Sequence, residues 1–137
     1  MTIAIDRFDH IVLNVRDVEA SAAWYAEVLG MHREDFASRS GSRTAMRFGR
    51  QKINLRPVDA DVVAWFTGVH PVAGSDDLCF ITEHTPQHVV AHLQALAVHI
   101  EAGPVERAGA LGPMTSVYCR DPDGNLIEIA WYPPASG

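Results

Sequence analysis

The order of structural elements predicted from the sequence occurs twice, and this repetition constrains the fold more than any single motif. A β-rich run at residues 8–15 is followed by a helical pattern from Asp17 to Gly30, and the same order returns at residues 76–82 and 85–98. The two copies are offset by about 67 residues, roughly half of the chain. A strand, a helix and then further strands in each half predict an α+β protein made from a duplicated βαβββ unit.

Local signals mark the limits of these elements. Asp17 and Thr85 are residues that cap helix N-termini, Pro86 suits a first helical position, and Gly30 suits a helix C-terminus. Three further strands are expected in each half, at residues 32–37, 44–48, 52–58, 99–105, 114–120 and 125–132. We expect one domain, with module one at about residues 6–58, a linker at about 59–75 and module two at about 76–133. The helices are expected on the outer face of a curved mixed sheet, which leaves its inner face around a cavity.

Composition and charge exclude several classes of protein. Hydrophobic residues make up 47% of the chain and charged residues 20%, as in ordinary folded domains. The formal net charge of -6 opposes binding to nucleic acid. The sequence shows no leader pattern and no apolar run near the ~20 residues of a membrane span, so we expect a cytoplasmic protein without a membrane partner. Cys79 and Cys119 lie in apolar runs and are expected to be reduced, buried thiols.

Alternation along the strands indicates which side chains face the cavity. In the first strand Ile11, Leu13 and Val15 form the more apolar face, which a helix should cover, so His10 is expected to point inward. Phe8 and Val12 share the face of His10. The same alternation directs a further set of mainly polar side chains inward: Asn54, Arg56, Asp77, Glu128 and Tyr132. Asp76 has the opposite parity, so an error of one residue in the register would exchange it with Asp77.

A metal site is the chemistry that this set predicts. One imidazole and two carboxylates, from His10, Asp77 and Glu128, suit a divalent ion, and a cation would relieve the repulsion between the two carboxylates. Glu128 is also the candidate catalytic residue for proton transfer. Arg56 offers a competing cation that could pair with Glu128 without a metal, or could bind an anionic substrate, and both alternatives stay open. The predicted substrate contacts are Asn54, Arg56 and Tyr132.

Several stretches resemble the vicinal oxygen chelate superfamily, which includes glyoxalase I, fosfomycin- and bleomycin-resistance proteins and extradiol dioxygenases. They are FDHIVLNVRDVEASAAWYAEVLGM, RFGRQKINL, DLCFIT and the long run GPVERAGALGPMTSVYCRDPDGNLIEIAWY, which together cover nearly the whole chain. The most specific is RDPDGNLIEI, where a DPDG turn is followed by an inward glutamate. KINL, DLCFIT and GALGP together are most similar to glyoxalase domain-containing proteins that include virulence-associated bacterial members.

This resemblance implies paired modules around a divalent metal ion such as Zn, Ni, Mn or Fe, a small-molecule substrate or ligand, and a homodimer. His10 and Glu128 fall on the ligand positions of the first and last strands. Asp77 stands where dioxygenases and fosfomycin enzymes have histidine, Asn54 where glyoxalase I has glutamate, and Arg56 where close relatives often have histidine. Because the two-histidine, one-carboxylate set of Fe(II) enzymes is not reproduced, a metal-dependent lyase or isomerase is favoured over an oxygenase. The alternatives are a metal-free protein that binds or sequesters a small molecule, and a structural or regulatory dimer.

Overall fold

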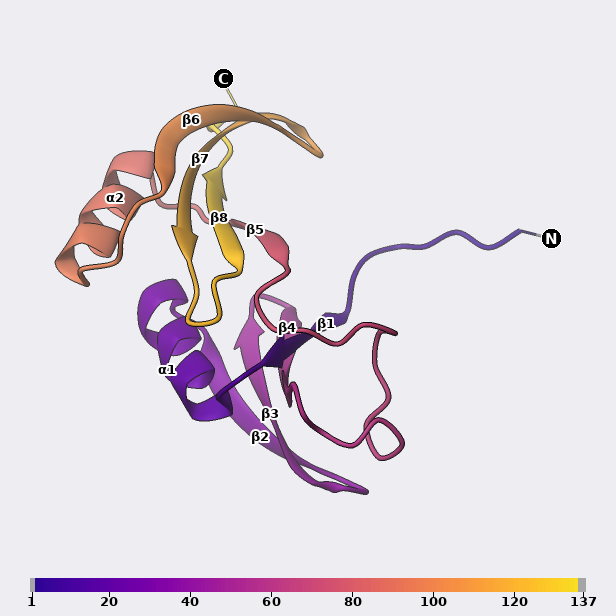
Figure 1. The fold of residues 1–137 in the computed structure, drawn as a ribbon. Coiled ribbons are helices and arrows are strands. Elements are labelled where there is room, and N and C mark those ends of the chain that lie inside the picture. The colour runs from indigo at the N-terminus through magenta and orange to yellow at the C-terminus, as the bar shows by residue number, and fades with distance from the viewer. Residues whose placement is uncertain (1, 136–137) are drawn as a thin grey trace. The chain divides into compact units, whose positions relative to one another are not determined.

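The computed structural model describes residues 2–135, which form two helices and eight strands in the order β1-α1-β2-β3-β4-β5-α2-β6-β7-β8 (Figure 1). The chain divides into two compact units, with the boundary between Ala73 and Gly74. Each unit contains one four-stranded sheet and one helix. The predicted α+β fold with two βαβββ modules is therefore confirmed, and each module has a mixed sheet of its own.

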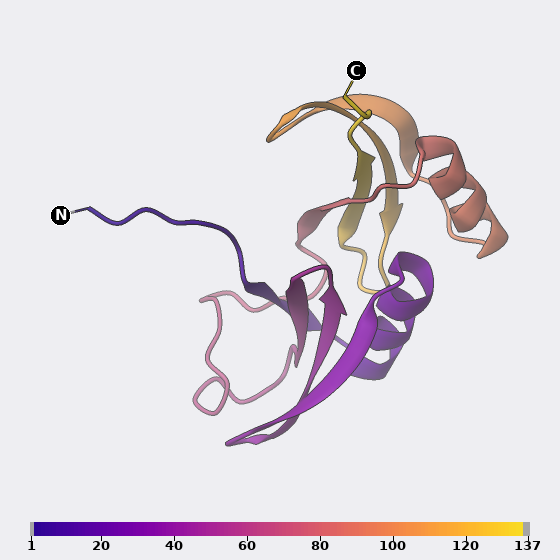
Figure 2. The same ribbon diagram turned by 180° about the vertical axis from the view of Figure 1, so that it is seen from behind.

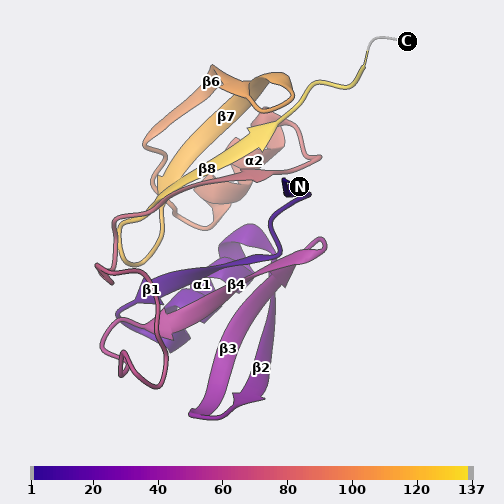
Figure 3. The same cartoon turned by 90° about the vertical axis from the view of Figure 1, so that its right-hand side faces the viewer.

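The sheet of the first unit has the strand order β1-β4-β3-β2 (Figure 3). β1 (His10–Val15) pairs in parallel with β4 (Gln51–Pro57), and β3 (Gly41–Phe48) is antiparallel to both β4 and β2 (His32–Ser38). α1 (Val18–Leu29) contacts β2, β3 and β4. β1 begins two residues later than predicted, because its partner strand β4 starts opposite this point.

The ends of α1 follow from its capping residues. Asp17 Oδ1 accepts a hydrogen bond from the Ala20 backbone N–H at 3.1 Å, which satisfies one of the unpaired donors of the first turn. Gly30 adopts a left-handed conformation with φ of 67°, and its N–H donates to the Ala26 carbonyl at 3.1 Å. Because glycine enters this conformation without a steric penalty, the helix ends where the sequence predicts.

The core of the first unit is the face that strand alternation predicts. Leu13 and Val15 of β1 are fully buried, whereas His10 is exposed. Leu13 pairs with Leu55 of β4, so the same face continues on the neighbouring strand. α1 covers this face with the buried side chains of Ser21, Ala22, Tyr25 and Val28. The opposite face of the sheet, which carries His10, is called its open face below.

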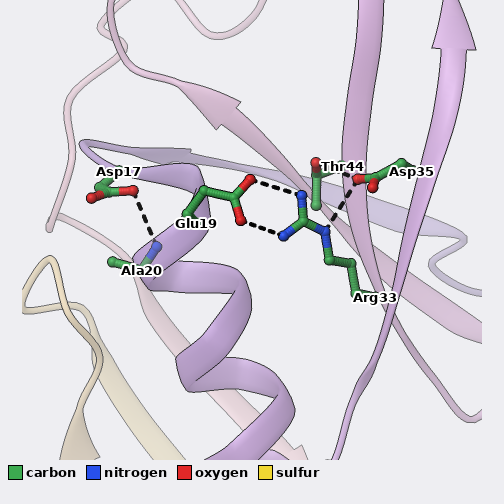
Figure 4. Close-up of polar contacts among 6 residues, drawn as sticks. All are labelled: Asp17, Glu19, Ala20, Arg33, Asp35 and Thr44. Atoms are coloured by element: carbon green, nitrogen blue, oxygen red, sulfur yellow. Dashed lines mark hydrogen bonds and ion pairs between the residues drawn. The ribbon is translucent and has the colours of Figure 1, made fainter.

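An ion-pair network at the edge of the first unit joins α1 to the outer strands (Figure 4). The Arg33 guanidinium donates to both carboxylate oxygens of Glu19, at 2.6 and 2.9 Å, and to Asp35 at 3.3 Å. The hydroxyl of Thr44 on β3 donates a hydrogen bond to the same Asp35 oxygen at 2.7 Å. The hydrogen bonds from Arg33 to Glu19 and from Thr44 to Asp35 lower the pKa of each carboxyl, so both stay ionised near neutral pH.

The sheet of the second unit has the strand order β5-β8-β7-β6, with α2 on one face (Figure 2). Its strands are β5 (Asp77–Ile81), β6 (Ala102–Gly109), β7 (Gly112–Arg120) and β8 (Leu126–Trp131). α2 (Pro86–Ala95) starts as predicted, with Thr85 as its N-cap and proline at its first position. The second core consists of buried side chains from α2 and from the strands that it covers: Val89, Leu93, Val117, Cys119, Ile127 and Ile129.

β6 differs most from the sequence prediction, which placed a strand at residues 99–105. The observed strand runs through Gly109, and six of its eight residues are exposed. β6 is the edge strand of its sheet, paired only with β7. An exposed edge strand needs no apolar alternation, so the sequence carries no periodic signal for it.

The RDPDGN segment forms a turn whose buried side chains, Asp121 and Asn125, tie β8 to β5. Asp121 Oδ1 accepts the backbone N–H groups of Asp123 and Asn125 at 3.0 and 2.9 Å, and its Oδ2 accepts from the Asn125 amide at 2.8 Å. Asn125 is fully buried, and its Oδ1 accepts the backbone N–H of Asp76 at 2.9 Å. These bonds fix the start of β8 beside the start of β5, which determines the direction in which Glu128 points.

The sequence also led to expectations about membrane spans and about the burial of the two cysteines. Among residues 2–135, neither helix combines the length and apolar character that crossing a bilayer requires. Cys119 is a buried free thiol, whereas Cys79 is exposed, so its predicted burial is wrong. Cys79 lies on the face of β5 away from α2, a side of the strand that carries little of the core.

Candidate functional site

His10, the predicted first-strand ligand, is the first residue of β1 and lies on the open face of the first sheet. Its side chain is 43% exposed, and its Nδ1 lies 2.7 Å from Asp9 Oδ2. The hydrogen bond to His10 lowers the pKa of Asp9, so this carboxylate is an acceptor. His10 Nδ1 must then carry the proton, and in the neutral imidazole Nε2 holds the free lone pair.

Glu128, the predicted last-strand ligand, lies among hydroxyl and thiol donors on the face of the second sheet away from the buried Ile127 and Ile129, which is called the open face of that sheet. The hydroxyl of Ser116, which is fully buried, donates to Glu128 Oε2 at 2.6 Å. Cys79 pairs with Glu128 across β5 and β8, and Tyr118 pairs with it across β7 and β8, so all three share one face. Glu128 is therefore a carboxylate held by its neighbours rather than a mobile surface group.

Arg107 and Tyr118 extend this polar cluster toward the sheet edge. Arg107 Nε donates to the Tyr118 hydroxyl oxygen at 3.0 Å. Burial raises the pKa of Tyr118; the Arg107 hydrogen bond opposes this, and the negative charge of Glu128 adds to it. The phenol stays protonated at neutral pH and is a hydrogen-bond donor beside Glu128.

The β5–β8 register distinguishes the two neighbouring aspartates. Asp77 pairs with Leu126, two residues before Glu128, so Asp77 points to the same face as Glu128 and Cys79. Asp76 has the other parity, and its backbone groups bind the turn before β8. Burial and the charge of Asp121 raise the pKa of Asp76. Asp77 is thus the aspartate on the open face, as the alternation predicts.

Cys79 offers a direct check of this cluster. Although the residue as a whole is exposed, loss of water around its sulfur, followed by the charge and hydrogen bond of Glu128, raises the pKa of Cys79 to about 11. We expect its alkylation by iodoacetamide to accelerate steadily from pH 8 to 10, at least about tenfold slower at pH 8 than that of an unperturbed thiol. Glu128→Gln should lower the pKa of Cys79 and accelerate its alkylation. Peptide mass spectrometry separates Cys79 from Cys119; a rate that levels off near pH 9 would contradict the arrangement.

Asn54, a predicted substrate contact, lies on the open face of the first sheet, opposite Val12 of β1 and Ala45 of β3. Its side-chain oxygen is buried and accepts no hydrogen bond from residues 2–135. A buried acceptor without a donor is uncommon in folded proteins and costs free energy. A ligand hydroxyl or amine at this oxygen would satisfy it.

Arg56 is fully buried, and its donors bind acceptors of the first unit. Nη1 donates to Asn14 Oδ1 at 2.9 Å, Nη2 to the Ala60 and Trp65 carbonyls at 2.9 Å each, and Nε to the Trp65 carbonyl at 3.1 Å. No carboxylate among residues 2–135 pairs with it. The guanidinium anchors the connection after β4, and its predicted contact with a substrate stays a prediction.

Tyr132 follows β8, and its hydroxyl oxygen accepts the Leu111 backbone N–H at 3.1 Å in the β6–β7 turn. A Cβ at Gly109, the last residue of β6, would crowd this hydroxyl and the Met114 sulfur, so a larger residue there would require one of these side chains to shift. Tyr132 therefore stabilises the turn, and its role in substrate binding also stays a prediction.

The predicted metal ligands are divided between the units, with His10 in the first and Asp77 and Glu128 in the second. Among residues 2–135, no three His, Cys, Asp or Glu side chains form a group that could hold a metal ion. Sequence reasoning missed Ser116, Tyr118 and Arg107. Alternation alone would have placed Ser116 and Tyr118 on one face of β7, but their proximity to Glu128 depends on the β7–β8 register.

Comparison with known proteins places this geometry in a family. Residues 7–129 match the family described as glyoxalase/bleomycin resistance protein/dioxygenase superfamily. Virulence protein STM3117 of Salmonella typhimurium is 44% identical over 93% of this chain and 85% of its own. Glyoxalase domain-containing protein RDO1 of Mycosarcoma maydis is 36% identical over 97% of this chain and 72% of its own.

A solved structure agrees with these sequence matches. A protein from the mobile metagenome of V. Pseudocholerae superposes with a TM-score of 0.91 and 40% identity, over 98% of this chain and 100% of its own. The family match spans both βαβββ units, and the two relatives exceed a third identity over nearly the whole chain. The chain belongs to the glyoxalase/bleomycin resistance protein/dioxygenase superfamily.

Proposed function

We propose that the protein is a divalent-metal-dependent lyase or isomerase acting on a small polar molecule, with His10, Asp77 and Glu128 as metal ligands. The observation that carries the proposal is that His10 and Glu128 are each oriented by a hydrogen-bonded neighbour. Asp9 engages His10 at 2.7 Å and Ser116 engages Glu128 at 2.6 Å. Metal-binding histidines and carboxylates in proteins are held in this way by outer partners.

In chemical type, these three donors suit a divalent ion. His10 keeps Nε2 for coordination because Nδ1 is bound to Asp9. Glu128 and Asp77 add carboxylate oxygens from one face of the second sheet. Imidazole nitrogen and carboxylate oxygen suit Zn²⁺, Mn²⁺, Ni²⁺ and Fe²⁺ alike. When bound, the ion would supply a Lewis acid that stabilises negative charge developing on a substrate oxygen.

The chain's own groups would provide binding and proton transfer. Glu128 is the carboxylate that would move a proton on the substrate, while Ser116 and Tyr118 hold it and limit its rotation. The unpaired Asn54 oxygen would accept a hydrogen bond from a substrate hydroxyl. A polar molecule with a hydroxyl and an ionisable carbon–hydrogen bond is therefore the substrate class that these groups suit.

Removing the outer partners tests the proposal. Asp9→Asn and Ser116→Ala should each weaken binding of Zn²⁺ or Mn²⁺ about tenfold, because they free a ligand to rotate without removing it. Calorimetric titration of the metal-free protein measures the affinity and stoichiometry. Ser42→Ala is the control, because it removes a hydroxyl from β3, a strand that carries no proposed metal ligand. A wild-type protein that binds none of the four ions would contradict the proposal and favour a metal-free binding protein.

A further inference from the structure

A cavity of about 280 Å³ lies entirely within the first unit, where β3, β4 and the start of α1 meet the connection after β4. Its walls include the apolar side chains of Val18, Leu55 and Pro57. It lies just below the ~300–1,000 Å³ of sites for drug-sized ligands, so it suits a smaller molecule. None of His10, Asn54, Asp77 or Glu128 lines it.

One wall of this cavity is held rigidly although it has no regular secondary structure. The Trp65 backbone N–H donates to the Asp61 carbonyl at 2.8 Å, and the Ala64 N–H donates to Asp61 Oδ2 at 2.9 Å. The buried Arg56 guanidinium binds the Ala60 and Trp65 carbonyls from behind. The wall therefore exists before any ligand arrives, which lowers the entropic cost of binding.

Two opposite charges line the cavity without neutralising each other. Arg43 and Asp61 both contribute to its lining, yet no ion pair within 4.0 Å joins either of them to a charged group of residues 2–135. Arg43 uses only Nη2 in hydrogen bonds, to Ser40 Oγ and the Ala64 carbonyl at 3.2 and 3.4 Å. Its Nε is buried and has no acceptor in the same range of the chain. Nη1 is not among the buried donors and makes no hydrogen bond in the described residues, so its protons are the ones left for a ligand.

The orientation of Arg43 and Thr44 is fixed by their neighbours. The Arg43 guanidinium stacks on the Trp65 ring, with 3.9 Å from its carbon to the ring centroid. The Thr44 hydroxyl donates a hydrogen bond to Asp35 at 2.7 Å (Figure 4), so its oxygen is left to act as an acceptor for any further partner. The cavity therefore presents donors from Arg43 and acceptors from Asp61 and Thr44.

We propose that this cavity is a second small-molecule site, which binds an α-amino acid or similar zwitterion with an apolar side chain. The carboxylate of such a molecule would bind the unused Arg43 donors, and its ammonium group would bind Asp61 and Thr44. Its side chain would lie against Val18 and Leu55. The cavity wall carries one positive and one negative side chain that do not pair with each other. A zwitterion can pair with both, whereas a simple anion or cation can pair with only one.

Three probes of one shape test this charge requirement: L-leucine, leucinamide without the carboxylate, and 4-methylpentanoate without the ammonium group. Binding is followed by ¹H–¹⁵N NMR of the Arg43 Nε–H and Trp65 indole N–H signals. We expect L-leucine to shift both signals to saturation with a Kd of about 1 mM or lower, and to bind at least about tenfold more tightly than either other probe.

Variants identify the groups responsible. Arg43→Gln should reduce the affinity for L-leucine to that for leucinamide, and Asp61→Asn, which keeps an acceptor for the Ala64 N–H, should reduce it to that for 4-methylpentanoate. Arg47→Gln changes an arginine on the same face of β3 that does not line the cavity, and it should bind L-leucine like the wild type. A dispersed spectrum shows that each variant is folded. Equal binding of all three probes, or no saturable shift with L-leucine, would overturn the proposal.

Discussion

Replacing Arg56 by methionine is expected to destabilise the first unit by about 3 to 5 kcal/mol. The side chain has 0% exposure, and its guanidinium binds Asn14 Oδ1 and the Ala60 and Trp65 carbonyls. Methionine fills a similar volume but donates no hydrogen bond, so these three acceptors lose the Arg56 donors, as do the Pro57 and Val58 carbonyls at 3.3 and 3.5 Å. Each buried polar group left unpaired costs about 1 to 3 kcal/mol, and relaxation of the connection toward water recovers part of the sum.

Urea unfolding measures this effect, with hydrogen exchange of the β1 and β4 amides as the reporter of the first unit. The midpoint should fall while the slope stays constant. Arg56→Lys should lie between the wild type and Arg56→Met, because one ammonium cannot reach all the acceptors. Arg47→Met, an exposed arginine on β3, is the matched control and should change stability little. If Arg56→Met unfolds like this control, the anchoring role of Arg56 is wrong.

Loss of either proposed principal ligand should have the largest effect on metal binding. We expect His10→Ala and Glu128→Gln each to weaken binding of Zn²⁺ or Mn²⁺ at least about 100-fold, beyond the effect of the outer partners. Alanine removes the imidazole, while glutamine keeps the shape of Glu128 and loses its charge. Since both residues are proposed to hold one ion, each single variant should weaken the same binding event.

Equilibrium dialysis with elemental analysis measures this loss as ions bound per chain. His32→Ala, which removes an exposed histidine of β2, is the control and should keep the wild-type stoichiometry. His84→Ala controls for binding by the exposed pair His84 and His88, whose rings stack with centroids 4.5 Å apart. If both principal variants retain the wild-type metal content, the ion is held elsewhere.

The fold was predictable because its signals are local. Asp17, Gly30, Thr85 and Pro86 mark helix ends through bonds to their own neighbours, and these lie where the sequence predicts. The buried strands alternate because one face packs under a helix, which reveals their parity. β6 has no such constraint at the sheet edge, and its limits were therefore missed.

The site was predictable only in part, because it depends on pairing between distant strands. Parity alone places His10 and Glu128 on the open faces of their sheets. Ser116 and Tyr118 lie beside Glu128 because of the β7–β8 register. The sequence of a single strand does not predict how that strand is aligned with its neighbour. Apart from Asn14, the partners of Arg56 that bury it are backbone carbonyls in or next to an irregular connection, which has no sequence periodicity from which they could be predicted.

Anomalous diffraction from zinc-loaded crystals tests the central proposal most directly, because it locates the ion and its ligands together. We expect one strong peak at about 2.0 to 2.2 Å from both His10 Nε2 and a Glu128 carboxylate oxygen. A peak bound by other side chains, or separate peaks at His10 and at Glu128, would contradict a shared metal site and with it the proposed metal-dependent chemistry.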